Sequence, residues 1–240
     1  MTSGTYAFQP SVADLVLNAY GRIGLKRAEL TQQHMADAAT EANFVQVEMA
    51  SRQPNLWMSE LYTVALVSGT ATYTLPARMI SPMAVYLTIT PSGGTAADRI
   101  LMPISTFEYA ALPVKTQTGT PSQYWYNRQV APQITLWPVP DDAATYTLNL
   151  QILSQPQDAS IPNGVTPQLP FRWLDAFTAA LAARLADIYA SATIQAKGPS
   201  GVTDLWAKAE RAWQIAANED HENVPTYIIP GISSYYGSNR

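Results

Sequence analysis

Two stretches near the start of the chain place apolar residues three to four positions apart, as in helices that bury one face. The first predicted helix starts at the capping pair Ser11–Asp14 and ends near Gly21 and Gly24. The second runs from a cap at Thr31 to about Gln53, where a proline follows. The apolar stripes consist of Val12, Leu15, Val16, Ala19 and Ile23, and of Met35, Ala38, Ala42, Val45 and Met49.

Between residues 59 and 158 the apolar positions recur at every second residue, which indicates strands. The alternation is clearest at residues 83–90 and 145–152, where each strand has one apolar face and one more polar face. The segment contains about six such runs separated by turn residues. This pattern favours an antiparallel sandwich or barrel.

Short connections suggest which of these strands pair. Glu60–Val67 and Thr70–Leu75 are separated by a Ser-Gly pair and are predicted to form a hairpin. Gln123–Tyr126 and Gln133–Trp137 form a second predicted pair. Pro140–Asp142 is predicted to turn the chain into the last strand.

Helical spacing returns after a loop at residues 160–168, with Pro170 near the first position of a third helix. Alanines surround its apolar stripe, which allows a neighbouring helix to approach closely. A loop at residues 197–201 ends it, and Thr203 or Asp204 caps a fourth helix. The stripes consist of Leu174, Phe177, Leu181, Leu185 and Ile188, and of Leu205, Ala209, Ala212 and Ala216.

This order of elements predicts an α+β fold: a four-helix α domain interrupted by an inserted antiparallel β-sandwich or barrel-like domain. Loops whose ends lie close together tolerate such insertions at modest entropic cost. Residues 1–58 and 159–222 would supply the two helix pairs, and residues 59–158 the β domain. Residues 223–240 lack helical spacing and are predicted to form an extended tail.

Composition narrows the possible functions. The chain has 240 residues, 47% of them hydrophobic, and no cysteine, which excludes disulfides, thiolate metal sites and a cysteine nucleophile. No stretch reaches the roughly 18 apolar residues of a membrane span. With 14 Lys and Arg against 18 Asp and Glu, tight binding of phosphates is not expected. Charged residues make up only 13%, so we expect neighbouring proteins to cover much of the surface.

Few residues offer catalytic or metal-binding chemistry. We interpret His34 and His221 as solvated or partner-facing side chains, and we expect neither metal nor cofactor. Asp141 and Asp142 could act as acid and base on a glycan, but adjacent carboxyls after a proline are more typical of a turn. The sequence therefore predicts no catalytic residue and no enzymatic activity.

Three motifs between about Val12 and Tyr189 resemble the head-to-tail adaptor family of short-tailed bacteriophages, which includes tail tubular protein A and related portal-bound connectors. The motifs are Gln53-Pro-Asn-Leu-Trp57, then Gly119-Thr-Pro-Ser-Gln-Tyr124 leading to Ile134-Thr-Leu-Trp-Pro-Val-Pro-Asp141, and Pro170-Phe-Arg-Trp-Leu-Asp-Ala176. As a set they are moderately specific, and singly they are weak.

The resemblance implies a structural role at the head–tail junction of the virion, after assembly in the host cytoplasm. The expected homo-oligomer is a dodecameric ring below the portal protein. Its partners would be the portal, the tail nozzle or tail tube protein, and tail fibres, with double-stranded DNA passing through the channel without specific binding. Acidic residues of the helices could line that channel and repel phosphate; the candidates are Asp37, Glu41, Glu48, Glu210 and Glu219.

In the resembling family the C-terminal segment reaches along the portal, and residues 223–240 suit that role. They combine large apolar side chains with prolines and glycines, so they cannot form a core of their own. We expect this tail to order on docking, although folding back onto its own helices is the competing interpretation. The predicted portal-docking residues are Tyr227, Ile228, Ile229, Pro230, Ile232, Tyr235 and Tyr236.

Two other functions remain open from the sequence. Tyr124, Trp125, Tyr126 and Trp137 could form a sugar-stacking platform, as in a carbohydrate-binding or receptor-binding virion tail component. At strand spacing, such aromatics are more often core on one face and subunit contact on the other. A glycan hydrolase would need a spaced carboxylate pair, which the sequence does not offer.

Overall fold

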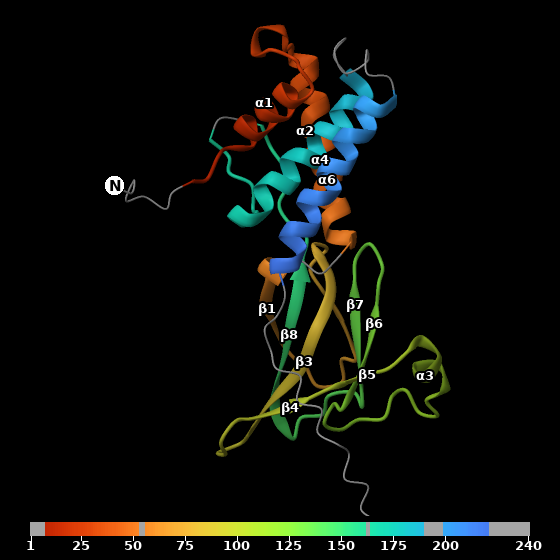
Figure 1. Ribbon diagram of the computed structural model, residues 1–240. Coiled ribbons are helices and arrows are strands. Elements are labelled where there is room, and N and C mark those ends of the chain that lie inside the picture. Colours follow the sequence, from red (N-terminus) through yellow and green to blue (C-terminus); the bar gives the residue numbers. More distant parts are fainter. Residues whose placement is uncertain (1–7, 53–55, 162–163, 190–198, 221–240) are drawn as a thin grey trace, which may run out of the picture.

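The computed structural model describes residues 8–52, 56–161, 164–189 and 199–220, with helices gathered at one end and strands at the other (Figure 1). The helices are α1 (Val12–Arg22), α2 (Gln32–Arg52), α4 (Leu174–Tyr189) and α6 (Pro199–Glu219), with a short α3 (Thr106–Ala111) beside the strands. Single 3-10 turns are η1 (Arg27–Glu29), η2 (Leu56–Met58) and η3 (Phe171–Trp173). The predicted α+β class is confirmed.

The predicted capping pair does start α1. The backbone N–H of Asp14 donates to the hydroxyl of Ser11 at 3.2 Å, and the backbone N–H of Ser11 donates to the carboxylate of Asp14 at 3.3 Å. These bonds satisfy two of the amide groups that a helix start leaves unpaired. The apolar stripes predicted for α1 and α2 face the interior, and only Met35 among them is partly exposed.

The alanine-rich helix α4 lies at the centre of the helical end and packs against α1, α2 and α6. Its buried alanines let those helices approach closely.

One part of the prediction is wrong: Ile188 is 52% exposed, although the stripe before it is buried. Helix α6 begins at Pro199, earlier than the predicted caps at Thr203 or Asp204, because proline is well accommodated at a first helical position.

Eight strands form two four-stranded sheets in the described residues. The first sheet has the order β1-β8-β3-β4 and the second the order β2-β7-β6-β5. All pairs are antiparallel except β5 with β6. Their bounds are β1 (Ser59–Ala65), β2 (Thr72–Thr74), β3 (Met79–Pro91), β4 (Ala97–Ile100), β5 (Met102–Pro103), β6 (Gln123–Asn127), β7 (Gln133–Trp137) and β8 (Ala144–Ser154).

Residues from both sheets share one hydrophobic cluster, which includes Leu87 and Leu150 from the first sheet and Ile134 and Leu136 from the second. The alternation predicted for residues 83–90 and 145–152 is confirmed for most positions. Met83 is an exception and is exposed, since the register of β3 shifts between Pro82 and Ala84 at a bulge, which re-aims side chains.

The predicted hairpin between Glu60–Val67 and Thr70–Leu75 is wrong. Strand β1 pairs with β8, whereas β2 pairs with β7 in the other sheet. The backbone N–H of Leu66 donates to the carbonyl of Tyr146 in the first sheet. The carbonyl of Ala71 accepts from the backbone N–H of Leu136 in the second sheet, so the chain crosses between the sheets within five residues. The second predicted pair, β6 with β7, is confirmed.

The sequence pattern missed three short elements. Strand β4 is exposed along its whole length, so it shows no alternation of apolar and polar residues. Strand β5 has two residues, and α3 has six. Among the helices that the structure describes, none combines the length and apolar character needed to cross a membrane.

Candidate functional site

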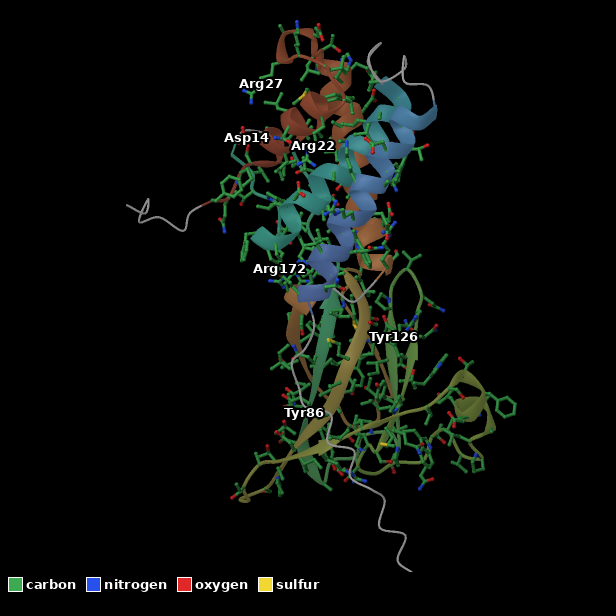
Figure 2. All side chains as sticks on the ribbon, viewed as in Figure 1. Asp14, Arg22, Arg27, Tyr86, Tyr126 and Arg172 are labelled. Atoms are coloured by element: carbon green, nitrogen blue, oxygen red, sulfur yellow. The ribbon has the colours of Figure 1, made fainter. Side chains whose placement is uncertain are left out.

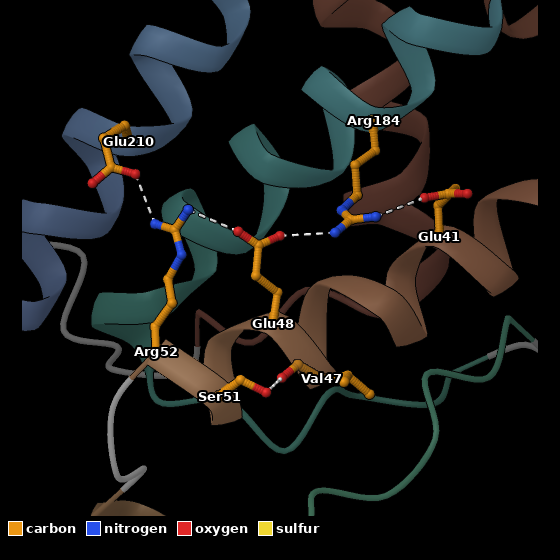
Figure 3. Close-up of polar contacts among 7 residues, drawn as sticks. All are labelled: Glu41, Val47, Glu48, Ser51, Arg52, Arg184 and Glu210. Carbon is orange, nitrogen blue, oxygen red and sulfur yellow. Dashed lines mark hydrogen bonds and ion pairs between the residues drawn. The ribbon is translucent and has the colours of Figure 1, made fainter.

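Five charged side chains from three helices form a continuous chain of ion pairs on the helical end (Figure 3). The guanidinium of Arg52 lies 2.7 Å from a carboxylate oxygen of Glu210 and 2.7 Å from one of Glu48. The guanidinium of Arg184 lies 2.8 Å from the other oxygen of Glu48 and 3.3 Å from Glu41. Glu48 on α2 thus bridges two arginines, and Arg52 connects α2 to α6.

This network engages three of the acidic residues that were named as candidates to line a channel. Glu41, Glu48 and Glu210 each pair with an arginine of the same chain. Burial works to lower the pKa of Arg52 and Arg184, but the hydrogen bonds and charges of these carboxylates outweigh it and raise the pKa of both. Both guanidinium groups therefore stay charged, and the network connects α2 to α4 and α6.

The histidines are not brought together with catalytic groups in the part of the chain that is described. The Nδ1 atom of His34 lies 2.7 Å from the hydroxyl of Thr31, and its ring contacts Tyr20 and Tyr189. The hydroxyl of Tyr189 donates to Asp37, so that acidic residue is also engaged. His34 serves the packing of α1, α2 and α4, whereas His221 lies outside the described residues.

Asp141 lies directly before a bend at residues 142 and 143, where the turn was predicted. Its carboxylate accepts a hydrogen bond from the backbone N–H of Ala143 at 3.2 Å and one from the hydroxyl of Tyr146 at 2.6 Å. The second bond contributes to a raised pKa of Tyr146, for which burial is the largest cause. This carboxylate shapes the entry into β8. Over the described residues, no three His, Cys, Asp or Glu side chains gather as a metal site would require.

We expect Asp141→Ala to destabilise the protein by about 1–3 kcal/mol, because it removes the acceptor of the Ala143 amide and leaves the Tyr146 hydroxyl with Thr120 alone, at 3.1 Å. Urea denaturation followed by far-UV circular dichroism measures this loss. The neighbouring Asp142→Ala, at an exposed position, is the control and should cost less. Hydrolysis of cell-wall glycan by the parent protein, lost in Asp141→Ala, would show instead that Asp141 is catalytic.

The aromatic residues of the β end are engaged within the chain. Tyr124 is buried between the sheets. Trp125 stacks on Tyr109 with 4.9 Å between ring centroids and 15° between planes, and its indole N–H donates to Thr106. The indole N–H of Trp137 donates to the carbonyl of Val114. One face of Trp125 is thus already covered, and these contacts favour packing over a sugar platform.

A cleft of about 480 Å³ opens where the helical end meets the strands. Its wall contains Trp57, whose indole N–H donates to the carbonyl of Gln168, and an ion pair between Glu60 and Arg78 at 3.0 Å. Phe171 of η3 lines it and is exposed. The cleft draws on five separate segments of the chain, so sequence spacing did not predict it. In the sequence, only the motifs around residues 53–57 and 170–176 pointed to this region.

The last described residues are anchored beside this cleft. The carboxylate of Asp220 is buried and forms an ion pair with Arg172 of η3. Arg172 also lies over the ring of Trp57, and its position at the edge of the helical end is labelled in Figure 2. The predicted portal-docking residues, Tyr227 to Tyr236, all lie outside the described residues. Asp220, the last described residue before that segment, is therefore held against η3 by its ion pair with Arg172.

Catalysis or sugar binding would use His, Asp and Trp side chains. In the described residues these side chains take part in packing instead, as is typical of a structural protein. The chain belongs to the SU10 adaptor protein family, whose profile matches residues 8–225. This confirms the resemblance to phage head-to-tail adaptors.

Comparison with solved structures gives a similar chain in the neck of an empty GTA particle, computed with C6 symmetry. The two are 15% identical, the match covers 88% of this chain and 95% of the other, and the TM-score is 0.26. No curated protein matches the chain.

Proposed function

We propose that this protein is a structural head-to-tail adaptor that forms a ring below the portal, continues the DNA channel and attaches the tail. Membership of an adaptor family over residues 8–225 carries this proposal. The ring is a homo-oligomer, with the dodecamer expected from the resemblance. Portal protein lies above it, and the tail nozzle or tail tube protein, with tail fibres, lies below. The protein acts in the virion after assembly in the host cytoplasm, and it has no enzymatic role.

In this proposal the two hydrophobic clusters are two domains, and the β-sandwich is inserted into a four-helix domain. One cluster draws on α1, α2, α4 and α6, and the other on the two sheets. Segments before and after the strands meet directly, as in the bond from the backbone N–H of Val12 to the carbonyl of Val165 at 2.8 Å. The boundaries proposed are residues 1–58 with 159–222, and 59–158.

The C-terminal segment, residues 223–240, is the proposed portal-docking arm. Its anchors are Tyr227, Ile228, Ile229, Pro230, Ile232, Tyr235 and Tyr236. Burial of each large apolar side chain contributes about 1.5–3 kcal/mol, while ordering costs about 1–2 kcal/mol per residue, so one arm binds weakly. A ring of arms binds firmly because the later contacts are intramolecular.

DNA passes through the ring as cargo and is not bound specifically. The net charge of −4 supports this, because a phosphate-binding surface needs an excess of Lys and Arg. The pairing of Glu41, Glu48 and Glu210 leaves Glu219, which is exposed, as the candidate for a channel-facing carboxylate. The alternative of a carbohydrate-binding tail component is disfavoured by the stacking of Trp125 on Tyr109.

We expect the purified protein to be monomeric alone and to form a discrete ring when mixed with the portal protein of its own particle, because the portal orders its copies. Native mass spectrometry of the mixture measures this directly. Failure to associate with any portal or tail component would contradict the adaptor function. Binding to glycan without binding to portal would favour the alternative.

A further inference from the structure

Three residues from separate segments fix the end of α6. Asp220 follows directly after this helix, and its carboxylate forms an ion pair with the guanidinium of Arg172 in η3. The guanidinium carbon of Arg172 lies 6.0 Å from the centroid of the Trp57 ring in η2. We call these three side chains the exit clasp, because residues 221–240 continue from Asp220. Figure 2 labels Arg172 near the place where the helical end meets the strands.

The exit clasp is attached to the core of the helical end. The ring of Trp57 packs against that of Trp173, with 5.2 Å between their centroids, and Trp173 is fully buried. Trp173 directly follows Arg172, and its backbone N–H donates to the carbonyl of Pro170 at 2.9 Å. Arg172 therefore projects from a turn that the core holds in place.

Stability alone does not account for an acidic residue at this position. The last carbonyls of a helix make its C-terminal end negative, so a carboxylate there is repelled. The side chain of Asp220 is only 3% exposed. Among the described residues, neither its Oδ2 atom nor the Nε atom of Arg172 has a hydrogen-bond partner. Burying these charges and unpaired atoms costs free energy, and apolar side chains of similar size are often at least as stabilising in such a place.

What the ion pair adds is direction. Apolar contacts permit sliding and rotation, whereas a charge-assisted hydrogen bond fixes the orientation of both partners. The backbone N–H of Asp220 also donates to the carbonyl of Ala217 at 3.1 Å, so its backbone and its side chain are both held. The chain therefore leaves the helical end from a fixed point and in a fixed direction.

We propose that the exit clasp orients the C-terminal segment, residues 221–240, for docking to portal, with Arg172 and Asp220 as positioning residues. An extended arm loses conformational freedom when it binds, and a fixed root reduces that loss. In a ring this holds for every copy, because later arms bind intramolecularly only if they point toward their sites. The proposal rests on the portal-docking role proposed above.

Spin labels measure the direction without portal. Because the chain lacks cysteine, Thr40→Cys and Asn223→Cys accept labels only at these two sites. Thr40 is exposed on α2, and Asn223 lies three residues beyond the clasp. Double electron–electron resonance should give a narrow distance distribution, which Asp220→Ala widens about twofold or more, since a coil without a fixed root samples many directions. Equal widths with and without Asp220→Ala would overturn the proposal.

Attachment to portal measures the consequence. Asp220→Ala in the full-length chain should weaken attachment by about tenfold or more in a co-sedimentation titration, because each arm then has to find its site. The melting temperature should hardly change: the variant removes a buried carboxylate from the unfavourable end of a helix, and Arg172, whose side chain is 28% exposed, stays within reach of water. A fall of several degrees would show instead that the pair stabilises the helix, and would overturn the proposal.

Two further variants serve as controls. Glu219→Ala removes the same charge one residue earlier, from an exposed position, and should leave the attachment and the distance distribution unchanged. Arg172→Met keeps an apolar stem beside Trp57. Combined with Asp220→Ala, it should weaken attachment no more than Asp220→Ala alone, because the ion pair is already lost. A further, additive loss would show that the two residues act separately and would contradict the clasp.

The outcomes separate this proposal from the docking role on which it rests. If Asp220→Ala widens the distance distribution but leaves attachment unchanged, the direction of the segment does not serve docking, and the proposal is wrong while the docking role stands. If the parent protein never attaches to portal, the docking role fails, and the distance distributions alone decide whether the clasp orients the segment.

Discussion

Trp173→Ala is expected to lower the free energy of unfolding by about 3–5 kcal/mol, which is a large part of the stability of an ordinary domain. The side chain of Trp173 is fully buried. Its ring centroid lies 5.2 Å from that of Trp57 and 6.3 Å from that of Trp213, so it joins η2, η3 and α6. Truncation removes these contacts and leaves a cavity that rigid helices cannot fill.

Urea denaturation followed by helical circular dichroism measures the effect. Trp125→Ala is the matched control, since it removes the same side chain from a partly exposed position at the β end and should cost clearly less. A loss below about 1 kcal/mol for Trp173→Ala would contradict the view that this tryptophan secures the start of α4 against α6.

Truncation after Asn223 is expected to abolish attachment to portal while leaving the melting temperature and the far-UV spectrum unchanged. Among the described residues, the last that the helical cluster buries are Ala216 and Ala217 of α6, and the truncation leaves both in place. The ion pair between Arg172 and Asp220 also survives the truncation and continues to hold the end of α6. The truncation removes the apolar anchors that we assign to portal binding.

Co-sedimentation with portal and a thermal melt of the same sample test both halves of this prediction. A full-length chain with Tyr227, Ile229 and Tyr236 changed to Ser is the control for length, and it should also fail to attach. If the truncated chain melts several degrees earlier and still binds portal, the segment belongs to the core of its own subunit and the docking hypothesis is wrong.

The helices could be predicted from the sequence because their signals are local. The Ser11–Asp14 pair is three residues apart, and the stripe of α4 repeats within each turn. The same local reasoning failed for the pairing of the first two strands, β1 and β2. A Ser-Gly connection between two apolar runs is typical of a hairpin, yet β1 and β2 join different sheets. Which sheet a strand joins depends on the inner face that it covers. The packing of all the strands together decides this.

The sequence by itself determined the four helices, most of the strands, the alternation of their faces and the family resemblance. Only the tertiary structure decided which charges are exposed, because Glu41 and its partner Arg184 are 143 residues apart. The same holds for the exposure of Ile188. Capping and periodicity act over one or two helical turns, whereas an ion pair or a groove exists only after distant segments have packed together.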